Sequence, residues 1–419
     1  MEGTTFGAGR PYEDCIIDSP PDDFRVSTQI YCDPDVFNAE MRDIFEKTWV
    51  YVAHDSEIPH PGDYKVGAVG RLPVIITRDK DSKVHVLLNA CRHRGSVVCR
   101  TEKGNTTKFM CPYHAWVYGI DGKLLSTSSV GGGFREGFAE KIGGLIKLPR
   151  VAIYRGMIFA SVSPEGESLE DHLGPVRTYV DLWFDQSPSG QVKLLEPRRS
   201  YYRGNWKFQL ENTTDGWHAR FVHESAFRTM KDFDLRDPAK NWEGCTRSFT
   251  HGNGLLERPL RTSFPGAIQG RYMALLRERH GAERAELAHY GRHITLFPNV
   301  HLMEFKVRVV QPVAVDKTIV YEFPIEFEDA PEEVNSAVTR RILNEGSLAA
   351  GFVNSDDVEI FARVQSGLNG AHLLKWLILS RGMGEEKPQP SGELVGEESY
   401  ELPQRAIYRE WARLMNGGA

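Results

Sequence analysis

Two short pairs of cysteine and histidine constrain this chain more than any other feature of its sequence. One residue separates Cys91 from His93, and two residues separate Cys111 from His114. Two thiolates and two imidazoles can bind a single zinc ion, or they can bind a [2Fe–2S] cluster with both cysteines on one iron and both histidines on the other. The first alternative gives a zinc-stabilised binding module, and the second gives an electron-transfer protein.

The order of the ligands favours the cluster. A zinc finger more often places two cysteines close together and two histidines further along on a helix. Here cysteine and histidine alternate, so each loop supplies one ligand to each of two metal atoms. Strand-like runs at 74–77 and 84–88 precede the first loop, and Asp121-Gly122 after the second loop is a hairpin turn signal. The region is therefore expected to be rich in β-strands, and a structural zinc remains the alternative.

A second group of ligand-type side chains follows at His218 and His223. Two histidines and one carboxylate on one face of an iron ion leave positions open for O₂. Five residues of ideal α-helix turn one side chain roughly 140° from the other, too far for both to bind one metal. We therefore predict a π-turn or a helix end between the two histidines. Asp356 and Asp357 are the candidate carboxylates.

Length and composition describe an ordinary globular protein with room for two domains. The chain has 419 residues, of which 41% are hydrophobic and 26% charged, and its net charge of −6 gives no sign of nucleic-acid binding. No apolar run is long enough to cross a bilayer, and the first residues lack the pattern of a secretory signal, so a cytoplasmic protein without membrane association is expected. Six cysteines are too few for a disulfide framework. The cysteines outside the two pairs are expected to be ordinary thiols: Cys15, Cys32, Cys99 and Cys245.

The pattern of strands and helices changes along the chain and indicates an α+β fold in three segments. Residues 1–48 form an N-terminal segment that ends in a helix from Asp35 to about Thr48. Residues 49–163 consist of short strand-like runs separated by Gly, Pro and Asn. Residues 164–419 mix the two types, with a strand at 319–325, a helix from Pro331 to about Leu348 and a helix from Arg405 to Met415. No G-x-G-x-x-G motif follows a strand, so electrons must come from another polypeptide.

The motifs around both groups resemble those of the Rieske non-heme iron oxygenases. C-x-H-R-G from Cys91 and C-x2-H-x-W from Cys111 resemble the Rieske loops, and N-W-K-x3-E-N-x2-D-G-x-H-x4-H from Asn205 resembles the catalytic iron motif of the same family. The resemblance implies that Cys91 and Cys111 bind one iron of a Rieske [2Fe–2S] cluster and that His93 and His114 bind the other. It also implies a mononuclear Fe(II) ion bound by His218, His223 and Asp357.

The resemblance assigns different roles to three aspartates. Asp357 is preferred to Asp356 because the second of two adjacent aspartates is the ligand in the family members that match. Asp356 would then cap a helix or support the ligands from outside. Asp215 would bridge His114 of a neighbouring subunit and His218, and so give each imidazole an acceptor for its other N–H. The alternative for Asp215 is a local helix cap.

The resemblance also implies a fold and a set of partners. Residues 49–163 would be a β-rich Rieske domain, and 164–419 a helix-grip catalytic domain in which an antiparallel sheet wraps around long helices. Residues 1–48 would pack on the catalytic domain. The assembly would be a homotrimer, with or without a small beta subunit. Electrons from NAD(P)H would reach the cluster through a reductase and a ferredoxin, and O₂ would be the co-substrate.

The chain looks most like the large (alpha) oxygenase subunit of an aromatic-ring-hydroxylating dioxygenase system. The expected substrate is a small aromatic molecule, and an aromatic carboxylic acid of the benzoate, anthranilate or salicylate type is preferred. A Rieske monooxygenase or an oxidative demethylase acting on a methylated amine or ether would use the same metal ligands and stays open. A carboxylate substrate would need a cation, for which Arg308 and Arg220 are candidates. The other residues expected to line the pocket are Leu210, Thr213, Ala219, Phe221, Leu296 and Phe352.

Overall fold

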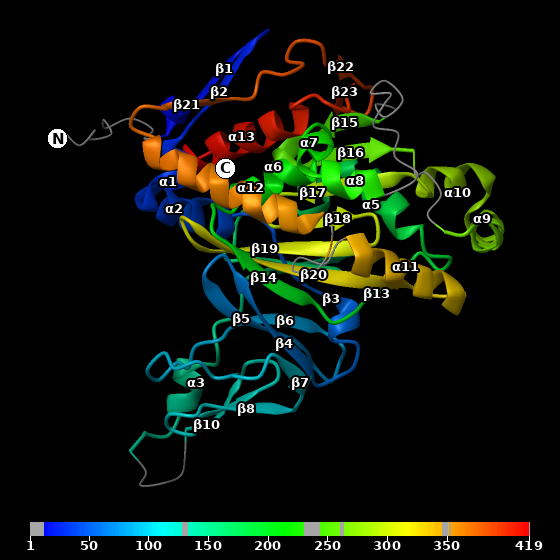
Figure 1. Ribbon diagram of the computed structural model, residues 1–419. Coiled ribbons are helices and arrows are strands. Elements are labelled where there is room, and N and C mark those ends of the chain that lie inside the picture. The colour runs from blue at the N-terminus through cyan, green and yellow to red at the C-terminus, as the bar shows by residue number, and fades with distance from the viewer. Residues whose placement is uncertain are drawn as a thin grey trace. The chain divides into compact units, whose positions relative to one another are not determined.

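The chain folds into two compact units, which are drawn in the computed structural model of Figure 1. The small unit is Phe45–Leu169, and the large unit combines Met1–Ile44 with Glu170–Ala419. The structure describes residues 12–127, 133–229, 244–259, 264–345, 351 and 353–418. One residue expected at the substrate pocket, Phe352, lies outside the described residues.

Short antiparallel strands make up most of the small unit. Its described strands are β3 (Val50–His54), β4 (Asp63–Val69), β5 (Leu72–Arg78), β6 (Val84–Leu88), β7 (Lys103–Asn105), β8 (Lys108–Met110), β9 (Val117–Gly119), β10 (Leu124–Ser126), β11 (Arg150–Tyr154) and β12 (Met157–Ser161). They form three sheets in the orders β6-β5-β4-β7, β10-β9-β8 and β11-β12-β3. The predicted turn at Asp121-Gly122 is confirmed, because it joins β9 to β10 and Gly122 has a left-handed φ of 84°.

The hydrophobic core of the small unit includes both cysteines of the paired motifs. Cys91 is 4% exposed and Cys111 is 2% exposed, and they pack in one cluster with Trp116 and Tyr118. Leu87 and Ile75 close the cluster from β6 and β5. The core therefore fixes the Sγ atoms, and the loops that follow each cysteine extend from it.

The large unit is built around one long antiparallel sheet. Its strands are β13 (Val192–Leu194), β14 (Arg198–Tyr202), β15 (Cys245–Ser248), β16 (Gly254–Arg258), β17 (Gly291–Leu296), β18 (Val300–Met303), β19 (Lys306–Ala314), β20 (Lys317–Phe327), β22 (Lys387–Pro388) and β23 (Leu394–Glu397). Their order is β13-β20-β19-β18-β17-β16-β15-β23-β22, and β14 also pairs with β20. A small separate sheet contains β1 (Ile16–Ser19), β2 (Asp23–Ser27) and β21 (Trp376–Ile378).

Helices accompany the strands of both units, and the predicted α+β class is confirmed. The described α-helices are α1 (Gln29–Cys32), α2 (Pro34–Glu40), α3 (Phe138–Ile142), α4 (Leu169–Leu173), α5 (Arg177–Phe184), α6 (Lys207–Thr213), α7 (Ala219–Val222), α8 (Glu224–Thr229), α9 (Gly266–His280), α10 (Ala282–Ala288), α11 (Glu332–Glu345), α12 (Asn354–Gly367) and α13 (Leu402–Met415). α13 packs beside α6, and α12 packs beside α7 (Figure 1).

The predicted elements of the large unit are present with shifted ends. The helix expected from Asp35 is α2 followed by a π-helical turn, Met41–Phe45, and Asp33 caps it by accepting the amide hydrogen bond of Asp35 at 2.7 Å. The expected C-terminal helix begins three residues earlier than predicted, at Leu402, because Pro403 is tolerated in its first turn. The expected strand at 319–325 is the centre of β20.

Three helices, α13, α6 and α12, contact one face of the long sheet, which we call the inner face; α12 does so where Arg308 donates to Asn354. The register places five residues in one row across neighbouring strands: Gly254, Thr295, His301, Arg308 and Glu322. Directly paired residues project from the same face of a sheet. α13 meets the row at its glycine, where an added Cβ would lie 2.9 Å from the Cβ of Pro403. α6 meets the same face at His293, whose Nδ1 lies 3.2 Å from the carbonyl oxygen of Thr213.

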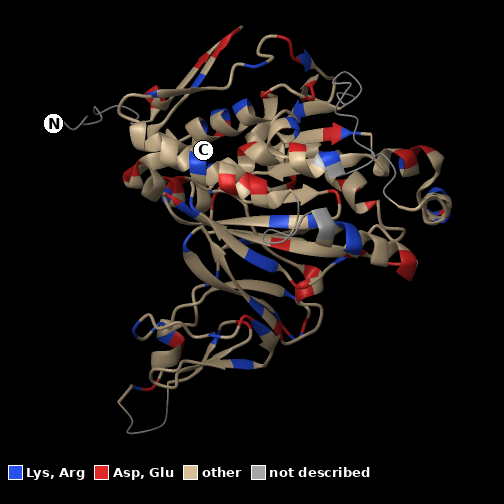
Figure 2. Ribbon diagram, viewed as in Figure 1, with Lys and Arg blue, Asp and Glu red and all other residues tan. Residues whose placement is uncertain are grey.

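Charged residues of both signs are interspersed along the helices and strands of each unit (Figure 2). Among the described residues, no helix is both long enough and apolar enough to cross a membrane. The four cysteines outside the paired motifs are free thiols, as expected; Cys15 and Cys99 are buried, and Cys32 and Cys245 are partly buried.

Candidate metal centres

The two loops with paired ligands have the same backbone geometry. In the first loop the amide of Cys91 donates to the carbonyl of Ser96 at 2.8 Å, and the amide of Gly95 donates back to the carbonyl of Cys91 at 2.9 Å. In the second loop the amides of Cys111 and Ala115 form the matching bonds, to Trp116 and to Cys111, at 2.8 and 3.0 Å. Each loop also contains one left-handed residue four positions after its cysteine. The sequence thus builds the same ligand-presenting turn twice.

The histidines of the two loops lie next to each other, outside the buried cysteines. The ring centroids of His93 and His114 are 4.4 Å apart. The ring of His93 stacks on Trp116, with centroids 5.0 Å apart and planes at 5°. Its Nδ1 is buried and has no hydrogen-bond partner among the described residues. Buried polar atoms normally have a partner, and a metal would supply one to this ring nitrogen.

The spacing of the ligand atoms fits two metal atoms better than one. A tetrahedral zinc with bonds of about 2.0–2.3 Å holds its ligand atoms roughly 4 Å from one another. In the described part of the chain, these four residues do not form a group of three or more whose ligand atoms all lie within 4.8 Å. A hollow of about 440 Å³ borders His93, Cys111 and His114. The donor set and its spread therefore fit a [2Fe–2S] cluster.

The second metal group comes from α7, its flanking residues and α12. α7 covers only Ala219–Val222, and His223 leaves the helical conformation at φ −101° and ψ 21°. The predicted helix end between the two histidines is confirmed, and it removes the angular obstacle that an ideal helix would impose. The rings of His218 and His223 have centroids 5.4 Å apart and planes at 78°.

One of the two adjacent aspartates completes the group. Oδ1 of Asp357 lies 3.2 Å from Nε2 of His223 and 3.5 Å from Nε2 of His218. The ligand atoms of these three residues all lie within 4.8 Å of one another. Asp356 is not a helix cap, because it lies inside the first turn of α12, and its Oδ2 is 3.5 Å from the other ring nitrogen of His223, Nδ1. A carboxylate in that place orients a ligand imidazole.

Asp215 contacts both the backbone and the ring of His218. Its Oδ1 accepts the amide hydrogen bonds of Trp217 at 2.6 Å and of His218 at 3.2 Å, which is the local cap weighed in the sequence. Its Oδ2 lies 3.6 Å from Nδ1 of the same histidine. Burial raises the pKa of Asp215, but the hydrogen bonds with His218 and Trp217 and the charge of the imidazole lower it further, so the net shift is downward.

The charges around His218 favour a cation at this site. Burial lowers the pKa of His218, but hydrogen bonds and charges from Asp215 and Asp357 outweigh it and raise the pKa to about 10. Burial likewise opposes ionisation of Asp357, yet the two histidines bring its pKa well below the usual range. The carboxylates thus favour a positive charge between them, and a divalent ion would replace the proton.

Two residues near this group were missed by the sequence interpretation. The side-chain amide of Asn212 lies 3.0 Å from both Nε2 of His218 and Oδ1 of Asp357. His293, on the inner face of β17, is bonded to the backbone of α6 as described above. Two sequence signals could have identified them. Asn212 lies inside the motif that contains His218, and His293 is a polar residue that alternates with apolar ones along a buried strand.

The residues expected to line a pocket are divided by the fold. Leu210 and Thr213 are buried on α6, and Ala219 is partly buried at the start of α7. Phe221 is 71% exposed, so α7 directs it outward and the expectation was wrong. Leu296 was also misplaced: it is buried, but it projects from the opposite face of β17 to Thr295, because side chains alternate along a strand.

The candidate cation Arg308 is buried and already paired. Its Nε and Nη2 donate to Oε1 of Glu322 at 2.9 and 2.7 Å, and Nη2 also donates to Asn354 at 3.0 Å. Asn354 is the first residue of α12, three residues before Asp357. Arg220 is partly buried on α7.

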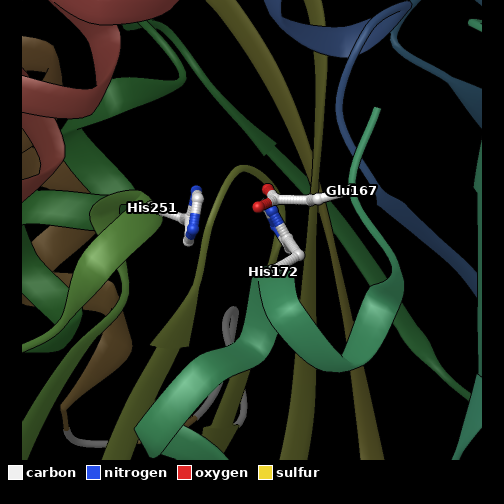
Figure 3. A group of neighbouring side chains, drawn as sticks. All are labelled: Glu167, His172 and His251. Carbon is white, nitrogen blue, oxygen red and sulfur yellow. The ribbon is translucent and has the colours of Figure 1, made fainter. Parts of the chain in front are cut away.

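Another pair of imidazoles in the large unit has protein partners instead. The rings of His172 and His251 have centroids 5.2 Å apart (Figure 3). Nε2 of His172 lies 3.4 Å from the carbonyl oxygen of Phe297, and Nδ1 of His251 lies 3.9 Å from a carboxylate oxygen of Glu410. Glu167, drawn in the same figure, belongs to the small unit. We interpret this pair as part of the packing of α4 and α13.

Each group of ligands lies within a region matched by a protein-family model. The family model for the ring hydroxylating alpha subunit (catalytic domain) matches residues 189–417, and that for the Rieske [2Fe–2S] domain matches residues 48–132. The large subunit of 2-halobenzoate 1,2-dioxygenase from Burkholderia cepacia is 36% identical over 86% of this chain and 80% of its own length. The large subunit of anthranilate 1,2-dioxygenase from Acinetobacter baylyi is 34% identical over 87% of this chain and 82% of its own.

The fold also matches that of a solved oxygenase structure. A naphthalene 1,2-dioxygenase with indole bound in the active site superposes with a TM-score of 0.88 and 26% identity, over 98% of this chain and 95% of the other. The small unit contains the Rieske loops, and the large unit combines the long sheet with His218, His223 and Asp357. The chain therefore belongs to the ring-hydroxylating oxygenases, as an alpha subunit with a Rieske [2Fe–2S] domain and a catalytic domain of the non-heme iron type.

Proposed function

We propose that this protein is the terminal oxygenase component of a system that hydroxylates an aromatic carboxylic acid. The observation that carries the proposal is the convergence of His218, His223 and Asp357 in a chain that also has two matching Cys–His loops. Relatives whose names specify 2-halobenzoate and anthranilate support an acidic aromatic substrate.

Each ligand has one part in this proposal. Cys91 and Cys111 would hold one iron of the cluster from the core of the small unit, and His93 and His114 would hold the other. In the large unit, His218, His223 and Asp357 would hold the mononuclear iron. A 2-His-1-carboxylate iron supplies O₂ activation at its open positions.

The surrounding residues hold the ligands and fix which ring nitrogens carry protons. Asp356 and Asp215 lie beside the Nδ1 atoms of His223 and His218, so each fixes the tautomer in which Nε2 is free for the metal. Asn212 contacts a ligand histidine and the ligand carboxylate together, and so holds α6 against α12. His218, His223 and Asp357 would thus hold the ion together, because their ligand atoms all lie within 4.8 Å of one another.

The proposal extends to the assembly and to the electron donors. We propose that its carboxylate joins His218 to His114 of a neighbouring subunit in a homotrimer, so that electrons cross between chains. The small beta subunit, the ferredoxin and the NAD(P)H-dependent reductase belong to the same proposal. The absence of a G-x-G-x-x-G motif after a strand supports an external electron donor.

The iron site is tested with two adjacent aspartates as a matched pair. Asp357→Ala should lose the mononuclear iron and all turnover while the visible absorption of the cluster stays. Asp356→Ala should keep the iron and lower turnover about 10–100-fold, as changes to the partner of a ligand histidine do. Iron content by mass spectrometry and the electron paramagnetic resonance signal of the reduced cluster are the readouts. Full iron in Asp357→Ala, or zinc without iron in the wild-type protein, would reject the assignment.

The bridging role of Asp215 needs a separate variant. Asp215→Asn keeps an oxygen that can accept the amides of Trp217 and His218, so both metals should remain bound. The transfer of electrons from the reduced cluster to the mononuclear iron should slow sharply in stopped-flow absorption. A wild-type rate in this variant would leave Asp215 as a helix cap only.

The substrate class is tested by product analysis in the reconstituted system. Benzoate, anthranilate and salicylate should yield hydroxylated products with O₂ consumption matched to product. Oxidation of methylated amines or ethers without turnover of the acids would identify a demethylase instead.

A further inference from the structure

The inner face of the long sheet is unusually polar below the iron site. Thr295, His301, Arg308 and Glu322 lie in one row across four neighbouring strands, and His301 and Thr295 are fully buried. Lys306, two residues before Arg308, projects from the same face. A pocket for an unsubstituted hydrocarbon would need an apolar wall, because buried polar groups without partners are costly.

The row lies between the points where two helices of the iron site contact the sheet. His293 attaches α6 to β17, and Asn212 of α6 contacts two of the iron ligands. Arg308 and Glu322 attach α12, which carries Asp357, to β19 and β20 through Asn354. β18, which carries His301, runs between β17 and β19. His301 therefore lies on the strand between the anchors of α6 and α12.

The hydrogen bonds of Thr295 determine which nitrogen of His301 carries a proton. Nδ1 of His301 lies 3.0 Å from the hydroxyl oxygen of Thr295. If the hydroxyl donates to Nδ1, both groups are satisfied there and Nε2 carries the proton. In the opposite arrangement Nδ1–H would donate to the hydroxyl oxygen. The buried hydroxyl hydrogen would then lack an acceptor, in addition to Nε2, which has no partner in either case. Nε2–H of His301 is then a fully buried donor, and it has no partner among the described residues.

The charges beside His301 favour an anion. Lys306 and Arg308 both donate to the same atom, Oε1 of Glu322, at 2.8 and 2.7 Å. The other buried carboxylate near Lys306, Glu304, is itself paired with Arg341 at 2.9 Å and Arg258 at 3.7 Å, so positive charges outnumber these two carboxylates. Burial is the main cause that lowers the pKa values of both His301 and His293. The charge of Arg308 lowers that of His301 further, and the charge of Arg258 that of His293, so neither imidazole adds a positive charge. A carboxylate beside His301 would meet a donor and a positive potential together.

We propose that His301 determines substrate specificity by donating its Nε2 hydrogen bond to the carboxylate of the aromatic acid. The inference rests on the proposed function and adds the group that recognises the acid. Lys306 and Arg308 hold the carboxylate electrostatically while Glu322 keeps them in place. Held in this way, the ring lies between the sheet and the iron ligands on α7 and α12.

The experiment compares an acid with a neutral ring of similar shape, in the holoenzyme with O₂ excluded so that no turnover occurs. Benzoate and toluene are titrated calorimetrically into wild-type protein and His301→Phe, which removes the donor and keeps an aromatic ring. Because a hydrogen bond to a charged group is lost, benzoate should bind about 10–100-fold more weakly to His301→Phe, with toluene changed less than threefold. His301→Gln, which retains a side-chain N–H, should recover part of the benzoate affinity.

The controls separate this role from folding and from the proposed function. Val309→Ala changes β19 on its other, more exposed face and should leave both affinities as in the wild type. If His301→Phe does not fold, Thr295→Val serves instead, because it removes the hydroxyl that fixes the tautomer and should weaken benzoate alone. Equal losses for benzoate and toluene, or no loss of benzoate, would overturn the role of His301. Wild-type protein that binds toluene but not benzoate would instead contradict the aromatic-acid function.

Discussion

At the scale of single residues, Glu211 on α6 is an acid buried next to the iron-site residue Asn212. Tyr31 donates to its Oε1 at 2.9 Å, and Tyr408 donates to the same atom. Burial raises the pKa of Glu211 to about 7, although the two tyrosine hydrogen bonds and Lys207 lower it in part. The folded protein therefore holds the proton of Glu211 more tightly than the unfolded chain does.

This difference predicts a pH dependence of stability. Because the folded pKa is raised, the contribution of Glu211 is complete below the unfolded value of about 4.5 and is lost as pH rises through about 7. The free energy of unfolding of the wild type should fall between pH 5 and pH 8. In Glu211→Gln this fall should be smaller by on the order of 2 kcal/mol. Urea unfolding across this range measures it, with the exposed Glu278→Gln as control. A constant offset between wild type and variant at every pH would contradict the prediction.

At the same scale, neighbouring residues of identical chemistry act differently. Asp356 and Asp357 are adjacent in sequence, but a helix turns successive side chains by about 100°. As a result one reaches the Nε2 atoms of two histidines and the other reaches Nδ1 of His223. The family motif selected the correct member of the pair for the ligand group, whereas the role of the other was visible only in the structure.

At the scale of elements, the two Cys–His loops repeat one turn with different residues in its left-handed position. Gly95 has φ 72° and Ala115 has φ 54°. An alanine in this conformation is strained by its Cβ, whereas glycine is not. Apart from the chain neighbours of Gly95, no described residue has an atom within 4 Å of a Cβ added there, so a change alters conformational energy without a clash.

The pair predicts opposite effects of opposite substitutions. Gly95→Ala should destabilise the small unit by about 1 kcal/mol, and Ala115→Gly should stabilise it by up to about 1 kcal/mol. Loss of the visible cluster absorption on heating would report both. Shifts of the same sign in the two variants would show that the loops are not equivalent.

At the scale of the whole molecule, a buried carboxylate is one of the contacts that join the N-terminal segment to the rest of the large unit. Glu40 on α2 accepts hydrogen bonds from Lys207 at 2.6 Å, Trp206 at 2.8 Å and Trp411 at 2.7 Å. Lys207 and Glu40 are both fully buried. The carboxylate thus joins α2, the start of α6 and α13, which are far apart in the sequence.

Breaking this pair should be more costly than replacing it. Glu40→Gln leaves the charge of Lys207 buried without a counter-charge and should destabilise the large unit by about 3–5 kcal/mol. The double variant Glu40→Gln with Lys207→Met removes both charges and should recover much of that loss. Denaturant unfolding of the wild type, the two single variants and the double variant gives the coupling free energy between Glu40 and Lys207. Additive effects of the two changes would show that the pair does not interact as its geometry indicates.

Local sequence was sufficient for features made within a few residues. The two loops, the turn at Asp121-Gly122 and the helix end before His223 depend on short-range geometry, and each was predicted correctly. Short-range sequence patterns could not predict which strands pair with each other. The face of Leu296, the exposure of Phe221 and the counter-ion of Arg308 depend on which elements meet, and the first two were wrong for that reason.

The sequence by itself determined the chemistry of this protein, because the metal ligands occur in short motifs whose spacing restricts the metals they can bind. Only the tertiary structure decided how the site could recognise a substrate. His301 lies in a strand between apolar residues, and its neighbours Thr295 and Arg308 belong to other strands. Strand register placed these side chains in one row, and register is set by the packing of the whole sheet against its helices. The two Cys–His pairs are local in sequence, whereas the polar row below the iron exists only in the folded chain.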